Sequence, residues 1–156
     1  MMRSFGLLGD GRNVEAITLG AAHGLQVEVL TYGAILRSLS FPVRGARREL
    51  ILNFDRLEDY VSDRAYVGTL VGRFGNRIAD SHFTLDGQVH RVSANEGVNH
   101  LHGGHLGFGK RLWRVLDVAT TDTPRVVLAL TSPAGEEGYP GTRHKRLPKP
   151  RCPPCR

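Results

Sequence analysis

Two polar clusters in the middle of the chain contain the residue types that bind small polar ligands. The arginine cluster, at 72–77, reads GRFGNR and holds Arg73, Asn76 and Arg77. The histidine cluster, at 99–104, reads NHLHGG and places two histidines beside two glycines. Arginine presents a planar fork of donors, and asparagine both donates and accepts, so both can pair with neighbouring hydroxyl groups. The two clusters together predict an open, donor-rich surface that suits a polyhydroxyl ligand better than a packed core.

The histidine cluster has three interpretations. If the segment is extended, His100 and His102 lie on the same face, and the glycines beside them let a ligand approach the backbone. Imidazole can then donate to or accept from a ligand hydroxyl near neutral pH. A polar loop with surface histidines explains the same pattern. A metal site at His100, His102 and His105 is disfavoured, because zinc gathers about three or four ligands and no nearby Cys or acid motif completes the set.

Three weaker patterns lie in and beyond these clusters. The arginine cluster lacks the Lys-Ser/Thr of a phosphate-binding loop. The alternative to ligand contact is that one of its arginines makes an internal salt bridge and the other faces water, and for at least one of the two we favour this alternative. Glu136 and Glu137 lie in a Gly/Pro loop, where a turn with solvated charges is the simplest interpretation. Cys152 and Cys155 form a lone C-x-x-C, which neither completes a zinc site nor opens a thioredoxin-like helix, so we regard it as incidental.

The positive charge is confined to one end of the chain. The net charge is +6 over 156 residues, but residues 142–156 alone hold six Lys or Arg and no acid. The remaining residues are neutral, which argues against a folded nucleic-acid-binding surface. Residues 142–156 also contain both cysteines, four prolines and one aliphatic residue, Leu147. We therefore expect this tail to be disordered.

Length and hydropathy bound the class of protein. A chain of 156 residues has room for one domain with a real core. No run of about 18 apolar residues occurs, so no membrane-spanning helix is predicted. The first residues contain no A-x-A-like cleavage site, and we expect a cytoplasmic protein.

The elements that must position the polar clusters are mostly strands. Alternating or short apolar runs predict strands at 25–29, 35–41, 49–54, 82–85, 88–92, 111–118 and 125–131. Asp86-Gly87 between two of these runs is a strong hairpin signal, because a type I′ turn needs positive φ at both central residues. A turn or bulge is expected at 32–34, and one helical turn at 57–61 after Asp55. The pattern predicts an all-β chain with an antiparallel sandwich or barrel.

With these motifs the chain resembles the aldose 1-epimerase (galactose mutarotase) family. The matching segments are LTYGA at 30–34, GRFGNRI at 72–78, FTLDG at 83–87, NHLHGG at 99–104, GFGK at 107–110 before Trp113, and Ser132-Pro133 followed by GEEGYPG at 135–141. They occur in the family's order and with its approximate spacing, from about residue 5 to residue 141. The resemblance implies a large antiparallel β-sandwich, of which this chain would form an incomplete part.

The resemblance also implies an isomerase of hexose metabolism. The family interconverts the α and β anomers of aldoses such as galactose and glucose, without metal or cofactor. A carboxylate base takes the proton of the anomeric hydroxyl while an imidazolium acid protonates the ring oxygen, the ring opens, and it closes on the other face. The implied partner is an aldohexose, and neither a nucleic acid nor a membrane is expected. No oligomeric state is predicted.

Three residues inherit a role from the family's motifs. Asn76 and Arg77 match its sugar-contacting pair, and His102 matches the histidine beside the sugar ring oxygen and hydroxyls. The family's general-acid histidine and general-base glutamate come later in its sequence than any matching segment. The resemblance therefore implies no catalytic residue in this chain, which corresponds to roughly the first two-fifths of a family domain. The alternative function is a non-catalytic carbohydrate-binding module that keeps the same three residues.

The resemblance stops after Gly141. The family continues there with alternating strands, whereas this chain changes abruptly to Arg, Lys, Pro and Cys. Residues 1–141 are therefore predicted to be the N-terminal part of a mutarotase-like sandwich domain, and residues 142–156 a separate basic tail. Reading a GC-rich gene in the wrong frame would produce such a change, which gives the hypothesis of a frameshifted or truncated product, or of a degraded gene.

Overall fold

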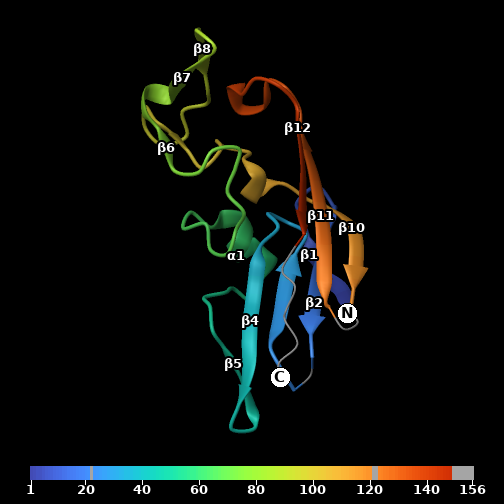
Figure 1. Ribbon diagram of the computed structural model, residues 1–156. Helices are drawn as coiled ribbons and strands as arrows, with labels where there is room; N and C mark the ends of the chain where they lie inside the picture. The colour runs from blue at the N-terminus through green and yellow to red at the C-terminus, as the bar shows by residue number, and fades with distance from the viewer. Residues whose placement is uncertain (22, 121–122, 149–156) are drawn as a thin grey trace.

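Two antiparallel sheets form the body of the protein (Figure 1). The computed structural model describes residues 1–21, 23–120 and 123–148. The first sheet contains, in chain order, β1 (Met2–Leu7), β2 (Asn13–Gly20), β3 (Gln26–Leu30), β4 (Leu36–Val43) and β5 (Ala46–Glu49). The second contains β10 (Arg114–Ala119), β11 (Arg125–Ser132) and β12 (Arg143–Pro148). Every strand pair between neighbours is antiparallel, so the predicted all-β antiparallel sandwich is confirmed.

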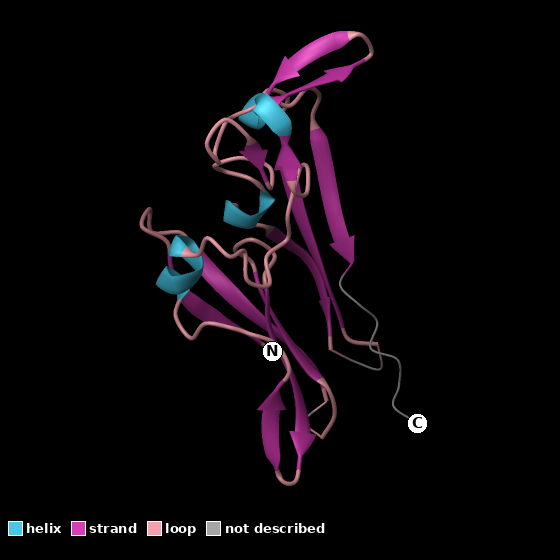
Figure 2. Cartoon of the chain, turned by 90° about the vertical axis from the view of Figure 1, so that its left-hand side faces the viewer, coloured by secondary structure: helices cyan, strands magenta, loops and turns pink. Residues whose placement is uncertain are grey.

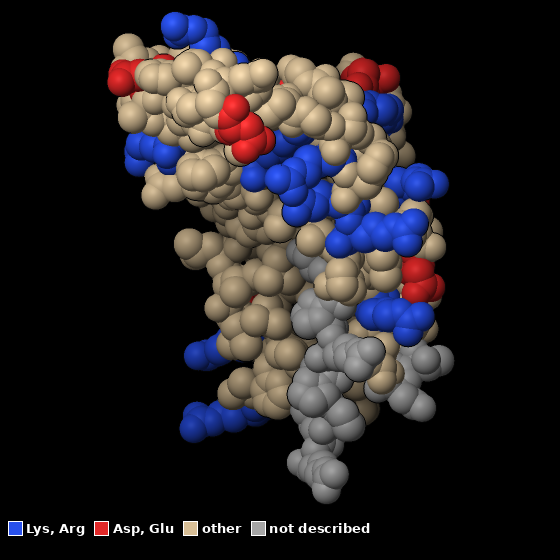
Figure 3. All heavy atoms as spheres, turned by 45° about the horizontal axis from the view of Figure 1, so that its top comes forward, with Lys and Arg blue, Asp and Glu red and all other residues tan. Residues whose placement is uncertain are grey.

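Smaller elements make a lobe above the two sheets (Figures 1 and 2). The lobe, residues 72–106, contains two short ladders: β6 (Arg77–Ile78) pairs with β9 (His100–Leu101), and β7 (His82–Leu85) pairs with β8 (Gln88–Arg91). Single 3-10 turns occur at Ala79–Ser81, Phe108–Lys110 and Glu136–Gly138, and the short helix α1 spans Leu57–Ser62. None of the helices in the described ranges is long and apolar enough to cross a membrane. Basic side chains gather in the middle of the face that Figure 3 shows.

The core forms on both faces of β2. Ile17 and Leu19 are buried in one cluster with Leu128 of β11. This cluster joins the two sheets. Val14 and Ala16 point the other way and are buried in a second cluster with α1. This follows from the period-two alternation of a strand, since a strand covered on both faces reads as a nearly continuous apolar run. Each large side chain that is fully buried contributes about 1.5–3 kcal/mol to folding.

The lobe is anchored in the core through Trp113. Its indole N–H donates to the Phe108 carbonyl (3.0 Å), and the two rings meet edge to face. The Phe108 N–H in turn donates to the Gly72 carbonyl (3.0 Å). A Cβ atom at Gly72 would lie 2.3 Å from the Phe108 ring, so only glycine allows this approach. The start of the arginine cluster is therefore fixed against the core.

Most of the local predictions are confirmed, and one is wrong. The strand near 25–29, the turn at 32–34, the helical turn, the Asp86-Gly87 hairpin and the last two predicted strands are all present. Asp86 and Gly87 have φ of 52° and 76°, as a type I′ turn requires. The strand predicted at 49–54 is absent, because β5 ends at Glu49 and the next residues form an irregular segment with Leu50 and Leu52 exposed. The apolar run there is not a buried one.

The expectation of a disordered tail is wrong for residues 143–148. They form β12, an edge strand that pairs with β11 from Arg143 opposite Ser132 to Pro148 opposite Val127. The ladder bonds come from the backbone, and Leu147 packs against the core cluster while the basic side chains stay exposed. Basic composition therefore does not prevent pairing at a sheet edge. Residues 149–156, with both cysteines, lie outside the described residues, and the frameshift hypothesis stays a prediction.

Candidate functional site

The fold brings the arginine and histidine clusters together through the β6–β9 ladder. Arg77 lies opposite Leu101 in this ladder, and the residues just beyond it, Asn76 and His102, bond to each other. The Asn76 N–H donates to His102 Nδ1 (3.0 Å), and the His102 N–H donates to the Asn76 carbonyl (3.1 Å). The three residues predicted to contact a sugar are therefore neighbours in space.

This bonding fixes the tautomer of His102. A backbone N–H can only donate, so Nδ1 must carry its lone pair, and the proton of the neutral ring lies on Nε2. The Tyr66 ring packs edge to face against the imidazole, with the ring centroids 4.6 Å apart. His102 is partly exposed. The partly exposed ring is thus held by two contacts and keeps Nε2–H as its hydrogen-bond donor.

His102 and two residues that contact or neighbour it have left-handed backbone conformations. Tyr66, Asn76 and His102 have φ of 57°, 71° and 52°, which is the left-handed region. Such a conformation costs a residue other than glycine about 1–2 kcal/mol and is an outlier for a bulky aromatic residue. Strain of this kind persists where the surrounding structure over-determines it, and it occurs often at functional sites.

Glu96 holds Arg77 in a two-pronged ion pair. Arg77 Nε donates to Glu96 Oε2 (2.5 Å), and a second bond joins Nη2 to Oε1. The hydrogen bond raises the pKa of Arg77 and lowers the pKa of Glu96. Glu96 is itself fixed by a reciprocal backbone bridge to Asn99. The guanidinium therefore keeps one orientation while more than half of its side chain stays exposed.

The other arginine of the cluster, Arg73, turns inward. Its guanidinium donates to the carbonyls of Ser132 and Pro133 at 2.8 and 2.6 Å, and to those of Pro140 and Gly141 at 3.0 and 2.7 Å. Nε also donates to the Ser132 hydroxyl (2.7 Å). The internal salt bridge expected for one arginine is not what Arg73 makes, because its partners are carbonyls and a hydroxyl. The ion pair belongs instead to Arg77, whose side chain stays exposed. Arg73 ties the lobe to the second sheet.

His100 is a core residue, and the predicted shared face with His102 is wrong. Its ring is fully buried, with Nδ1 2.6 Å from the Ser93 carbonyl and Nε2 2.7 Å from the Tyr139 hydroxyl. Strand β9 ends at Leu101, and the positive φ of His102 turns the chain. With both ring nitrogens occupied, His100 has no lone pair for a metal. No group of three or more His, Cys, Asp or Glu in the described ranges could hold one.

The two adjacent glutamates point apart, and neither is simply solvated. Glu136 pairs with Arg111. Glu137 accepts the backbone N–H groups of His105 (3.1 Å) and Leu106 (2.7 Å). The interpretation of this loop as a turn with solvated charges is therefore wrong, because Glu137 fixes the end of the histidine cluster.

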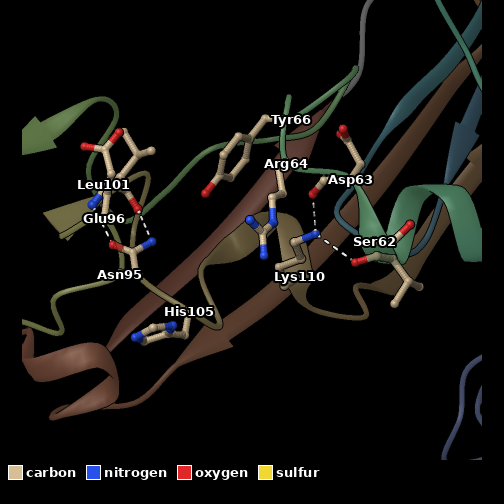
Figure 4. A pocket seen from close by; sticks show the side chains of 11 residues that line it. Ser62, Asp63, Arg64, Tyr66, Asn95, Glu96, Leu101, His105 and Lys110 are labelled. Carbon is tan, nitrogen blue, oxygen red and sulfur yellow. Dashed lines mark hydrogen bonds between the residues drawn. The ribbon is translucent and has the colours of Figure 1, made fainter.

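A cleft of about 480 Å³ opens beside these residues (Figure 4). Tyr66 and Glu96, the partners of His102 and Arg77, line it together with Arg64. Lys110 closes one end by donating to two backbone carbonyls at the end of α1 (3.0 and 2.9 Å), and burial lowers the pKa of this lysine. Figure 4 shows the Arg64 side chain pointing into the cleft between Tyr66 and Lys110.

Sequence analysis missed Tyr66, Glu96 and Glu137. None of them lies in the polar clusters, and their spacing to those clusters carries no periodic pattern. The sequence predicts Glu137 only as a solvated charge in a turn. Tyr66 packs on His102, Glu96 bonds to Arg77, and Glu137 bonds to the backbone after the histidine cluster. These contacts depend on distances between residues far apart in the sequence, which the sequence does not contain.

The match to a known family settles the class of protein. The family model described as aldose 1-epimerase matches residues 15–147. The chain belongs to the aldose 1-epimerase family. It is 38% identical to the aldose 1-epimerase of Escherichia coli (strain K12) over 133 residues, and 42% identical to the galactose mutarotase of Bos taurus over 123 residues. These matches cover 85% and 75% of this chain but only 38% and 33% of the relatives, so the chain spans well under half of their length.

Solved structures agree with this assignment. The galactose 1-epimerase from Lactobacillus acidophilus matches 95% of this chain, with a TM-score of 0.78 and 30% identity. A galactose mutarotase/aldose epimerase homologue from C. elegans matches 85% of the chain, with a TM-score of 0.77 and 32% identity. The matched part amounts to 43% and 40% of those two chains.

Proposed function

We propose that this chain carries the sugar-positioning part of an aldose 1-epimerase site. The observation that carries the proposal is the reciprocal bonding of Asn76 and His102 beside the oriented guanidinium of Arg77. Relatives named aldose 1-epimerase and galactose mutarotase support aldoses such as galactose and glucose as the ligands. Anomer interconversion by acid/base ring opening is the activity to which this site contributes.

The three residues offer complementary groups to a sugar ring. His102 offers Nε2–H to a ring oxygen or hydroxyl, and Arg77 offers the N–H groups that Glu96 does not use. The Asn76 side-chain amide both donates and accepts, so it suits a hydroxyl that does both. We assign the general acid and the general base to no residue of this chain. The proposal therefore expects sugar binding without fast anomer interconversion.

An NMR titration of the purified chain with D-galactose tests binding. We expect millimolar affinity, with shift changes centred on residues 76, 77 and 102. His102→Ala removes one hydrogen bond and should weaken binding by about three- to tenfold. His23→Ala is the matched control, because His23 is exposed between β2 and β3 and does not line the cleft.

Polarimetry on α-D-galactose tests turnover with the same samples. Binding without faster mutarotation supports the proposal and is also the behaviour of a non-catalytic carbohydrate-binding module. Clear catalysis that depends on His102 would show that the chain carries its own acid and base. Shift changes equally sensitive to both histidine variants would place the sugar elsewhere.

A further inference from the structure

A second groove, of about 430 Å³, shares only Arg77 with the proposed sugar site. We call it the Phe74 groove. It lies where the arginine cluster, the β7–β8 hairpin and the start of β12 meet. Its lining residues are Arg73, Phe74, Arg77, Ile78, Phe83, Leu85, Tyr139, Pro140 and Arg143.

One wall of the Phe74 groove is apolar and open to solvent. Phe74 is 47% exposed and Leu85 48% exposed. The Phe83 ring continues the wall and packs on the buried Tyr139 ring, with the centroids 6.0 Å apart. Aromatic rings that are firmly backed and exposed on one side suit the flat or C–H face of a small ring compound.

The charged residues that line the groove are all arginines. Glu96 neutralises Arg77, but the partners of Arg73 are carbonyls and a hydroxyl. In the part of the chain that the structure describes, no ion pair joins Arg73 or Arg143 to a carboxylate. The groove thus carries positive charge on Arg73 and Arg143 that no described carboxylate pairs with.

The register of β12 explains why Arg143 faces Arg73. Arg143 lies opposite Ser132, and directly opposed residues of an antiparallel pair share one face of the sheet. Ser132 is buried and accepts two hydrogen bonds from Arg73. The pKa of Arg73 is lowered, first by burial and next by the charge of Arg143. Both arginines line the groove, and all five N–H groups of Arg73 already donate to the protein, so Arg73 contributes charge and Arg143 offers the free donors to an anion.

We propose that the Phe74 groove binds a small ring compound that carries a carboxylate or a phosphate group. The Arg143 fork pairs with either oxyanion, and the apolar wall receives the ring. A bare anion would leave Phe74 and Leu85 uncovered, and a neutral ring would leave Arg143 unmatched. A second copy of this chain fits poorly, because pairing two grooves face to face would bring their arginines together.

Four probes, followed by NMR at the Phe rings and Arg Nε groups, test this proposal. D-glucuronate and α-D-glucose 1-phosphate carry the two oxyanions on a ring. D-glucose carries the ring alone, and acetate the anion alone. We expect at least one of the two ring anions to shift Phe74 and Arg143 signals, with affinity at least tenfold above acetate. D-glucose should leave these signals in place. Whichever ring anion binds more tightly identifies the oxyanion that the groove prefers.

Two variants of β12 make the test specific. Arg143→Gln should weaken binding of the preferred ring anion by about tenfold, as expected for loss of a charge-assisted contact. Lys145→Gln is the matched control, because it removes an equal charge two residues along the strand and outside the groove. Equal losses in both variants, or equal affinity for acetate, would reduce the effect to general charge attraction and overturn the proposal.

Two further outcomes separate this proposal from others. If the Phe74 and Arg143 signals change with protein concentration but with none of the four probes, the groove takes part in self-association. That outcome would overturn the proposal. His102→Ala should leave ring-anion binding unchanged while it weakens D-galactose binding. Failure at one site is thereby distinguished from failure at the other.

Discussion

Asn76 and His102 bond to each other twice, once through the backbone and once through the imidazole. The second bond, from the Asn76 N–H to His102 Nδ1 (3.0 Å), decides which ring nitrogen keeps the proton of the neutral ring. In the proposed site Asn76 has two separable roles. Its backbone orients the histidine, and its side-chain amide, which has no hydrogen-bond partner among the described residues, is proposed to contact the sugar.

Replacing Asn76 by glycine and by alanine separates these roles. Asn76→Gly keeps the N–H and the positive φ, so the Nε2–H tautomer should persist in the imidazole ¹⁵N spectrum while D-galactose binding weakens. Asn76→Ala loses the same side chain and must also hold a φ of 71°. It should therefore be less stable than the glycine variant by about 1 kcal/mol in urea unfolding. Equal stability of the two variants would contradict the backbone role.

Arg73→Lys should destabilise the protein although it keeps the charge. The guanidinium donates to four carbonyls and one hydroxyl, a set that a single ammonium on a flexible stem cannot reach. Hydrogen bonds of a charged donor contribute about 1.5–3 kcal/mol, so urea unfolding should show a loss of about 2 kcal/mol or more. Arg91→Lys, at an exposed position of β8, is the control and should change stability by less than about 0.5 kcal/mol. Similar losses in both variants would show that Arg73 does not tie the lobe to the sheet.

Tyr139→Phe tests whether the buried His100 depends on its partner. The Ser93 carbonyl can only accept, so His100 donates from Nδ1 and accepts the Tyr139 O–H at Nε2. Removing the hydroxyl leaves a buried acceptor unsatisfied, which should cost about 1–3 kcal/mol in thermal or urea unfolding. Tyr66→Phe is the control, because the Tyr66 hydroxyl has no hydrogen-bond partner among the described residues. A loss in Tyr66→Phe as large as that in Tyr139→Phe would refute the argument.

The sequence predicts the local elements of this fold better than their assembly. Asp86-Gly87 predicts its hairpin because the signal, positive φ at two residues, is local. The edge strand β12 is not predictable in this way, because its side chains are basic and its stability comes from backbone pairing with β11. The apolar run that contains Leu50 and Leu52 wrongly predicts a buried strand. An apolar sequence does not show whether another element covers it, and here both side chains are exposed.

The same distinction applies to the site. The arginine and histidine clusters predict where the polar residues gather, but not which of them face a ligand. His100 and His102 are two residues apart, yet one is buried and the other partly exposed, because the positive φ at His102 turns the chain. Arg73 and Arg77 also differ in their partners. Arg73 bonds to carbonyls of the second sheet and its following loop, whereas Arg77 is oriented by Glu96.

Acid should loosen the end of the histidine cluster through Glu137. Burial works to raise the pKa of this carboxyl, but hydrogen bonds from the Ser93 hydroxyl and the N–H groups of Leu106 and His105 outweigh burial, so the pKa is lowered. A carboxyl whose pKa is lower in the folded chain stabilises the fold fully above its unfolded pKa, about 4.3, and loses that effect as the pH falls through the folded pKa. Amide exchange at residues 105 and 106 should therefore accelerate, relative to the core, at acid pH.

Glu137→Gln identifies the carboxyl responsible. An amide keeps the shape of the side chain but accepts more weakly than a carboxylate, so the variant should be less stable than the natural chain at pH 7. The difference should shrink toward pH 3, where the natural carboxylate is itself being protonated. Glu58→Gln is the control, because Glu58 is exposed on α1 and has only a distant contact with Arg56 (3.7 Å). If the Glu137→Gln difference were constant from pH 7 to pH 3, its cause would be packing of the amide rather than the ionised carboxylate.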